Sequence, residues 1–416
     1  MARRILLLTQ WFDPEPAFKG LLFAKELVKR GFEVEVLTGF PNYPGGKLYP
    51  GYRVRFLMRE NIDAVRVTRV PLYPSHDRSA WRRVINYLSF AASATIYGCF
   101  FARRFDVIYA YHPPLTVGIA ASLIGFLRRR PMVYDVQDLW PDTLSATGMI
   151  TNARVLRVVD RFCRWVYSRA SHIAVLSPGF KARLIAKGVP SEKVSVIYNW
   201  ADEGSLRSAS VAIDESSRAR EGVELVILFA GNMGRAQGLE SVLDAAMILQ
   251  RDATLVRFHF IGGGLEVARL KARATEMGLR NVEFFDPVPM SEIGRIIARS
   301  DVLLVHLRPD PLFEITIPSK TQAYLCAGKP ILMAVRGDAA NLVLEADAGV
   351  LAEPGDPESI AHAVRRLVAL PAPRRREVGD NGSRFYREHL SISSGVDKFA
   401  ALFTNLSAHR RQVDCD

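Results

Sequence analysis

Short apolar runs alternate with amphipathic segments along almost the whole chain. In the first half the runs read RILLLT, EVEVLTG, DVIYAY, MVYDVQD, HIAVLS and VSVIYN; in the second half they read ELVILFAG, VRFHFIGG, NVEFFD, DVLLVHL and KPILMAV. Runs of Val, Ile and Leu separated by helical segments are typical of parallel strands that are covered on both faces. The pattern therefore predicts an α/β protein with two doubly wound, Rossmann-like domains.

The boundary between the two domains is predicted by a change in composition. A polar segment, NWADEGSLRSASVAIDESSRAREG, separates the two blocks of apolar runs. We therefore expect a first domain over 1–200 and a second over 201–390. A last helix is expected over 391–412, and the sequence leaves open whether it returns to the first domain.

Glycine-rich segments follow several of the predicted strands. In FAGNMGRAQGLESVLDAA an apolar strand ends at Phe229, and a helix begins at about Gly238. Similar segments end at Gly20 and cover 261–264. Such turns aim backbone N–H groups and a helix N-terminus at the space beyond the strand, which favours an anion. A single loop of this kind can be purely steric, but several at strand ends indicate a nucleoside diphosphate in a cleft between the domains.

Composition excludes several other classes. The chain has 416 residues, of which 49% are hydrophobic and 24% charged, an ordinary globular profile. Its four cysteines are scattered and have no metal-ligand spacing, which indicates a reduced, cytosolic setting. No G-x-G-x-x-G follows a strand, which disfavours a dinucleotide-dependent dehydrogenase. The only D-x-D lies at 414–416, so we expect neither a metal nor a cofactor.

The basic charge is concentrated in the first half. Residues 1–200 hold 29 Lys and Arg against 14 Asp and Glu, whereas residues 201–416 hold 26 against 29. This asymmetry suggests a polyanionic neighbour, either nucleic acid or an anionic membrane. No helix-turn-helix, zinc or RNP pattern supports nucleic acid.

One apolar stretch is long enough to raise the question of a membrane span. Nineteen uncharged residues, 84–102, lie between the arginine pairs 82–83 and 103–104. The stretch includes Asn86 and three hydroxyl residues, and the next predicted strand follows at once. We therefore expect a largely buried helix with one face on an anionic membrane surface, on the cytoplasmic side.

The order of the motifs points to a known family. The strand-PEP-loop-KG start is followed by PNYPGGKLYPGY, HPP, DVQDLWP, VIYNWAD, GNMGRAQGL, IGGG and IPSKTQAYLCAGKPIL. This order resembles the retaining GT-B glycosyltransferases of family 4, especially bacterial envelope-polysaccharide transferases of the O-antigen, capsule and N-acetyl-L-fucosamine type. The resemblance implies transfer of a sugar from a nucleoside diphosphate, expected to be UDP, to a polyprenyl-diphosphate-linked saccharide. The donor would bind to the second domain and the acceptor to the first.

The resemblance also implies roles for individual residues. Catalytic roles fall to His112, Glu314, Lys320 and Arg235. Substrate contacts fall to Lys19, Gly20, Asp138, Asn199, Gly231, Asn232, Gln237, Gly238, Gly263, Gly264, Ser319 and Gln322.

Two departures from the family pattern bear on the site. Many relatives have cations where this chain has Asn232 and Gln237, so that Arg235 is the one charge left in the loop. The second glutamate of the usual Glu-x7-Glu motif is replaced by Ala323, and only Glu314 is carried over.

Each assignment has an alternative interpretation. His112 could be a satisfied core histidine, Asp138 a turn cap, and Asn199 an ordinary turn residue. Lys320 could be solvated, but a cation at a helix N-terminus opposes the dipole, so an anionic ligand explains it better. At the level of the whole protein, a nonhydrolysing nucleotide-sugar epimerase or a phosphorylase would share the two-domain plan.

Overall fold

The computed structural model describes residues 3–75, 80–146, 148–207 and 225–413. The chain forms two compact units. Unit 1 comprises Met1–Ile197 together with Gly395–Asp416, and unit 2 comprises Tyr198–Ser394. The predicted fold class, α/β with two Rossmann-like domains, is confirmed.

Unit 1 is built on an eight-stranded sheet in the order β3-β4-β2-β1-β5-β6-β7-β8. All neighbours pair in parallel except β3 and β4. The strands are β1 (Arg3–Leu8), β2 (Phe32–Gly39), β3 (Met58–Ile62), β4 (Val65–Val70), β5 (Val107–Tyr111), β6 (Met132–Val136), β7 (His172–Val175) and β8 (Val194–Val196).

The antiparallel edge corrects the expectation of a wholly parallel sheet. Strands β3 and β4 are joined by Asp63 and Ala64, whose φ angles are 47° and 66°. Two positive φ angles in a two-residue connection form a tight hairpin turn. This turn contains no Asn-Gly or Asp-Gly pair and β3 is half exposed, so neither strand was predicted.

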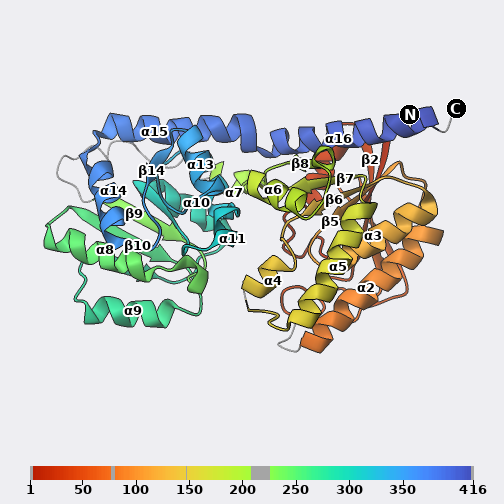
Figure 1. Ribbon diagram of the computed structural model, residues 1–416, viewed down its shortest axis with the longest axis horizontal. Coiled ribbons are helices and arrows are strands. Elements are labelled where there is room, and N and C mark those ends of the chain that lie inside the picture. Colours follow the sequence, from red (N-terminus) through yellow and green to blue (C-terminus); the bar gives the residue numbers. More distant parts are fainter. Residues whose placement is uncertain (1–2, 76–79, 147, 208–224, 414–416) are drawn as a thin grey trace. The chain divides into compact units, whose positions relative to one another are not determined.

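The helices of unit 1 cover its sheet (Figure 1). Helices α2, α3 and α5 lie side by side on this unit. The helices are α1 (Leu21–Lys29), α2 (Ala80–Phe100), α3 (Leu115–Arg128), α4 (Asp142–Ala146), α5 (Ala153–Arg169), α6 (Pro178–Ala186) and α16 (Ile392–Val413), with a short 3-10 turn over Ser191–Lys193.

The last helix, α16, contributes to the core of unit 1. Phe399 packs edge-on against Phe23 and Tyr109, with ring centroids 5.4 Å apart in both pairs. Phe403 lies 5.8 Å from Tyr109 and is also fully buried. These aromatic contacts place the C-terminal segment with the first unit, one of the two arrangements that the sequence left open.

Unit 2 carries a six-stranded parallel sheet in the order β11-β10-β9-β12-β13-β14. Relative to the order of its strands along the chain, this is the 3-2-1-4-5-6 arrangement, whose switch point lies between β9 and β12. The strands are β9 (Leu225–Ala230), β10 (Val256–Ile261), β11 (Val282–Phe285), β12 (Val302–His306), β13 (Ile331–Ala334) and β14 (Gly349–Leu351).

Two hydrophobic cores lie on the two faces of this sheet. Leu243 of α8, Leu270 of α9 and Ile360 of α14 belong to one core. Ile297 of α10 and Leu325 of α12 belong to the other. The helices are α7 (Glu203–Arg207), α8 (Glu240–Arg251), α9 (Val267–Glu276), α10 (Met290–Arg299), α11 (Pro311–Glu314), α12 (Ser319–Ala327), α13 (Asp338–Glu345), α14 (Pro357–Ala369) and α15 (Ala372–Phe385), with a 3-10 turn over Arg235–Gln237 and a π-helical turn over Tyr386–Leu390.

Candidate functional site

The turn after β9 packs backbone to backbone against the loop after β10. A Cβ built on Gly262 would lie 2.1 Å from the Gly231 carbonyl oxygen, and one built on Gly264 would lie 2.3 Å from that of Met233. Gly231 itself has a φ of 131°, a conformation that other residues rarely adopt. Glycine at these positions is thus required by the close approach of two loops at the carboxyl ends of neighbouring strands.

Lys320 lies beside this turn, in the first turn of α12. Its Nζ is 3.3 Å from the centroid of the Phe229 ring, and a Cβ on Gly231 would lie 2.9 Å from its Cε. Burial lowers the pKa of Lys320 to about 7. No carboxylate is paired with this ammonium among the residues that the structure describes. Pro318 provides no side-chain cap for α12, so the lysine accompanies an open helix N-terminus.

This arrangement favours an anionic ligand. An ammonium in apolar surroundings without a counter-ion is costly, and a helix N-terminus adds positive potential. A perturbed lysine at a strand-end turn is therefore a candidate for a functional group. An anion at this position would relieve both costs at once.

The other predicted residues of α11 and α12 differ in exposure. Ser319 is exposed in the first turn of α12, next to Lys320. Gln322 is 2% exposed and faces the interior of the unit. Glu314 is half-buried at the end of α11, with its carboxylate 4.0 Å from Arg336. Ala323, in the place of the second family glutamate, packs against the hydrophobic core.

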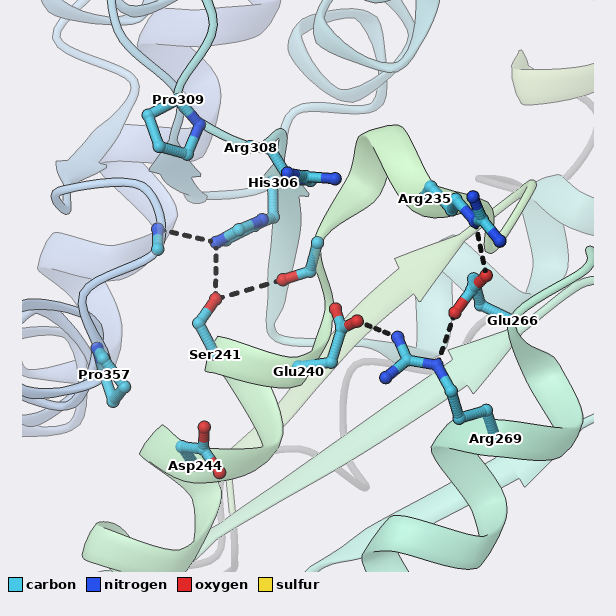
Figure 2. Close-up of a pocket in the computed structure, with 12 residues that line it drawn as sticks. Arg235, Glu240, Ser241, Asp244, Glu266, Arg269, His306, Arg308, Pro309 and Pro357 are labelled. Atoms are coloured by element: carbon cyan, nitrogen blue, oxygen red, sulfur yellow. Dashed lines mark hydrogen bonds and ion pairs between the residues drawn. The ribbon is translucent and has the colours of Figure 1, made fainter.

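The second half of the turn lines a separate cavity of about 670 Å³ (Figure 2). Arg235 is one of its exposed residues, and its Nε lies 3.5 Å from Glu266. Arg269 lies between Glu240 and Glu266, as Figure 2 shows, and its Nε donates to Glu266 at 2.5 Å. The cavity is lined by Arg235, Gly238, Glu240, Ser241, Asp244, Glu266, Arg269, His306, Arg308, Pro309, Gly355 and Pro357. Lys320 and Gly231 do not line this cavity. The two predicted cations, Arg235 and Lys320, therefore lie at different places around the turn.

His306 holds this part of the turn in place, and sequence reasoning missed it. Its Nδ1 lies 2.6 Å from the carbonyl oxygen of Gln237. Because a carbonyl only accepts, Nδ1 carries the proton. Nε2 then accepts from the Gly355 N–H at 3.3 Å. The Ser241 hydroxyl, which donates to the Gly238 carbonyl at 3.1 Å, lies 3.0 Å from Nε2. Burial lowers the pKa of His306 to about 4, which keeps the imidazole neutral in this arrangement.

The signal for His306 was present in the sequence. It is the last residue of the apolar run that forms β12, where a polar side chain faces the ligand-binding edge of a parallel sheet.

Gly238 and Gln237 of the neighbouring turn are also held by local contacts. Gly238 has a φ of 55°, and a Cβ there would lie 2.5 Å from Arg308 Cγ. The Gln237 side chain accepts from the Gly234 N–H at 2.9 Å.

The remaining predicted loop residues of unit 2 differ in exposure. Asn232 is exposed. The carbonyl of Gly263 accepts from the Met233 N–H at 2.7 Å, and a Cβ on Gly263 would lie 3.3 Å from Pro287. Asn199 follows β8 and falls in unit 2.

In unit 1, Lys19 has an internal structural partner. Its ammonium is fully buried and forms an ion pair with Asp135, which also accepts from the Tyr109 hydroxyl. The Phe399 ring of α16 lies 4.8 Å from Lys19 Nζ. Lys19 therefore connects the loop before α1 with strand β6 and helix α16. The substrate contact that the resemblance implied for it has no support here, because its charge is already neutralised in the interior.

Gly20 is explained by packing. The Asp13 carboxylate caps α1 by accepting from the Leu21 N–H at 2.7 Å. A Cβ on Gly20 would lie 2.4 Å from that carboxylate. Glycine at this position thus leaves space for the Asp13 carboxylate. This is a steric reason for the glycine, in place of contact with an anion.

His112 and Asp138 follow neighbouring parallel strands, β5 and β6. His112 is 2% exposed, with its ring 5.8 Å from Tyr134 and 5.3 Å from Trp140. Its Nδ1 is buried and has no hydrogen-bond partner among the described residues. Burial lowers the pKa of His112 to about 3 and raises that of Asp138. A neutral, unsatisfied imidazole at the edge of the sheet could accept or donate a hydrogen bond to a ligand hydroxyl.

Comparison with known families decides the class. Residues 21–200 match the glycosyl transferase 4-like domain, and residues 224–369 match the glycosyl transferases group 1 domain. The chain belongs to the glycosyltransferases. The predictions of a family 4 GT-B glycosyltransferase and of an enzyme are confirmed.

Individual relatives of this glycosyltransferase are distant. It is 28% identical to the putative colanic acid biosynthesis glycosyl transferase WcaI of Escherichia coli K12 over 83% of this chain and 86% of the relative. It is 26% identical to the probable glycosyltransferase WbjE of Pseudomonas aeruginosa over 72% and 74%. Among solved structures, Anabaena HepE in complex with UDP superposes with a TM-score of 0.67 at 17% identity, covering 97% of this chain and all of that one. That likeness shows the shared GT-B fold.

The lowered pKa of the partly buried Lys320 predicts how stability depends on pH. The ordinary lysine pKa is 10.5, and that of Lys320 in the folded enzyme is about 7. Between these values the unfolded chain binds more protons than the folded one, so wild-type stability rises with pH. We expect Lys320→Met to be more stable than the wild type at about pH 7, and the difference to vanish towards about pH 10, as measured by urea unfolding.

The control is Lys271→Met, which changes an exposed lysine of α9. Its effect should be small at every pH. A stability difference for Lys320→Met that stays constant over this range would contradict the lowered pKa of Lys320.

Proposed function

We propose that this glycosyltransferase moves a sugar from a UDP-linked donor to a polyprenyl-diphosphate-linked saccharide in bacterial envelope-polysaccharide synthesis, with retention of configuration. The observation that carries the donor class is the unpaired ammonium of Lys320 beside the Gly231 turn. The names of two relatives, one of them a colanic acid biosynthesis transferase, support the pathway class. The UDP bound to HepE supports the nucleotide.

The diphosphate is expected to lie between the turn after β9 and the N-terminus of α12. When the bond between sugar and phosphate breaks, negative charge develops on the departing diphosphate. Lys320 and the open N–H groups of α12 provide fixed positive potential for that charge, at little reorganisation cost. Asn232 and Ser319 are exposed at the same two elements and supply polar contacts.

The proposed site needs no metal. Preorganised amides and a lysine perform the role that a diphosphate-bridging cation would have. No group of carboxylate, histidine and cysteine side chains suited to a metal occurs in the part of the chain that the structure describes. The proposal therefore assigns charge stabilisation to this chain's own residues.

The sugar and acceptor contacts are assigned to other residues. Glu314 is half-buried and accepts hydrogen bonds from sugar hydroxyls in this proposal. His112 offers its unsatisfied Nδ1 to a hydroxyl, and Asp138 positions the acceptor. The acceptor proton passes to the departing phosphate oxygen, as the family resemblance implies.

An exposed apolar face of unit 1 supports membrane association. Trp81, Leu88 and Phe100 of α2 are 78%, 56% and 74% exposed, and Phe126 of α3 is 69% exposed. Arginines at 82–83 and 103–104 flank α2. No described helix is long and apolar enough to cross a bilayer. We propose that this face lies on the cytoplasmic surface of an anionic membrane, where a lipid-linked acceptor is within reach.

The donor proposal predicts the effect of removing Lys320 on nucleotide affinity. Loss of a charge-assisted contact costs about 1.5–3 kcal/mol, which corresponds to about one to two decades in Kd. We expect Lys320→Ala to weaken UDP binding by that amount in titration calorimetry. Arg235→Ala should act in the same direction but less, because Glu266 already pairs with Arg235.

Two further variants make this test specific. Lys271→Ala removes an exposed lysine of the same unit and should leave the affinity unchanged. Glu314→Gln should keep UDP affinity while lowering turnover of the full donor. Unchanged UDP affinity in Lys320→Ala would remove the assignment of this turn to the diphosphate.

The membrane proposal predicts the outcome of liposome flotation. Each basic residue near an anionic surface contributes about 1 kcal/mol to binding. We expect binding to require anionic lipid, to fall with added salt, and to weaken strongly when the arginines at 82, 83, 103 and 104 are all changed to Gln.

The matched control changes the same number of charges in unit 2. Arg280, Arg295, Arg299 and Arg376 are exposed, and replacing all four by Gln should leave flotation almost unchanged. Equal loss in both quadruple variants would mean that net charge, rather than this face of unit 1, drives binding. Binding to neutral liposomes that survives high salt would also contradict the proposal.

A further inference from the structure

Unit 1 contains an apolar groove that the proposed transfer does not use. It lies between α2, the end of β4 and the segment before β3, and its volume is about 490 Å³. Volumes of this size are typical of sites for small organic ligands. Its principal side chains are Phe56, Leu57, Leu72, Ile96, Tyr97 and Phe101.

Large apolar side chains remain open to solvent at this groove. Phe56 is 84% exposed, Ile96 is 54% exposed and Phe101 is 58% exposed. Apolar surface that is removed from water contributes about 25 cal/mol per Å², so an apolar occupant would be bound favourably. The cluster is contiguous around one hollow, in contrast to scattered surface residues, which need no explanation.

The polar groups of the groove are already satisfied within the protein. The Ser93 hydroxyl donates to the Pro71 carbonyl at 2.5 Å. The Ser89 hydroxyl accepts from the Tyr73 N–H at 2.8 Å and donates to the Asn86 carbonyl at 3.0 Å. An extended peptide would need hydrogen-bond partners for its backbone, which these serines do not offer. A hydrocarbon chain needs none.

Arginines lie at the hollow and in the segment that leads to it. Arg53 and Arg55 are exposed in the segment that carries Phe56, and Arg59 is itself part of the lining. Arg59 also contacts Tyr97, with the guanidinium 6.0 Å from the ring centroid. Arginines beside an apolar groove favour an amphiphile, because the cations can bind an anionic head group while the groove binds its hydrocarbon tail.

We propose that this groove binds the first part of the prenyl chain of the acceptor lipid, while the rim arginines contact its diphosphate. The inference rests on the proposed lipid-linked acceptor and extends it to a defined site. One groove accommodates one chain, which fits a single-chain prenyl lipid better than a two-chain phospholipid. Withdrawal of the chain from the bilayer would hold the attached saccharide at a fixed distance from unit 1.

The test uses farnesyl diphosphate as a soluble probe, below its micelle concentration, in titration calorimetry. Saturating UDP is present so that the probe's diphosphate cannot occupy the nucleotide site. We expect the wild type to bind the probe and inorganic diphosphate to bind at least tenfold more weakly. Ala92→Trp fills the groove from an exposed position on α2 and should weaken probe binding at least tenfold.

Two controls separate this result from misfolding. Leu344→Trp adds the same ring at an exposed site on α13 and should bind the probe as the wild type does. UDP affinity, measured in separate titrations of the same protein preparations, should be equal in all three proteins. Arg55→Gln combined with Arg59→Gln should weaken the probe but not UDP.

Three results would overturn the groove assignment. These are no binding of farnesyl diphosphate by a wild type that binds UDP, equal binding of the probe to Ala92→Trp, and a dimer in sedimentation that Ala92→Trp dissociates. The last would make the groove an interface between two copies. Each of them leaves the donor proposal standing, because UDP binding is recorded separately.

Discussion

The proposed donor site of this transferase depends on one partly buried lysine, Lys320, that has no counter-ion among the described residues. The ammonium of Lys320 lies over the Phe229 ring and against the Gly231 turn, at the N-terminus of α12. A folded protein seldom leaves a cation in such surroundings unless a ligand completes the site. A nucleoside diphosphate supplies the missing charge. The same charge grows during bond cleavage, so one residue serves both binding and departure of the leaving group.

The geometry around Lys320 is fixed by two kinds of contact that carry no charge. Glycines at 231, 262 and 264 let two strand-end loops touch backbone to backbone. His306 then connects the end of β12 to the carbonyl of Gln237 and to the Gly355 amide. Because burial keeps this imidazole neutral, its hydrogen bonds do not change near neutral pH. The turn is therefore rigid on both sides of the position assigned to the diphosphate.

The sequence predicted the parallel sheets, because they follow from the periodicity of apolar residues. It did not predict elements that depend on local turn geometry or on tertiary packing. Apolar runs identified both parallel sheets, because strands buried on two faces need continuous Val, Ile and Leu. The β3–β4 hairpin was missed because Asp63 and Ala64 adopt positive φ without the usual glycine. The short strand β14, Gly349–Leu351, was also missed.

Site residues show the same division. Lys320 was carried over from the family resemblance, and a local argument, its charge at a helix N-terminus, then favoured an anionic ligand over a solvated lysine. Lys19 is adjacent to a loop glycine and was also assigned to the substrate. Its partner Asp135 is 116 residues away, so local reasoning could not identify their ion pair. The contact of His306 with Gln237, 69 residues away, was likewise invisible to local reasoning, although the position of His306 at the end of the β12 run was a local signal.

Proton uptake on UDP binding tests the central claim most directly. At about pH 8.5 the nucleotide phosphate is fully ionised, while Lys320, with a pKa of about 7, is largely neutral in the free enzyme. A bound diphosphate should raise that pKa, so calorimetry in two buffers of different ionisation enthalpy should show uptake of close to one proton. Lys320→Arg remains charged in both states and should show none. Wild-type binding without proton uptake, or equal uptake by Lys320→Arg, would contradict the account.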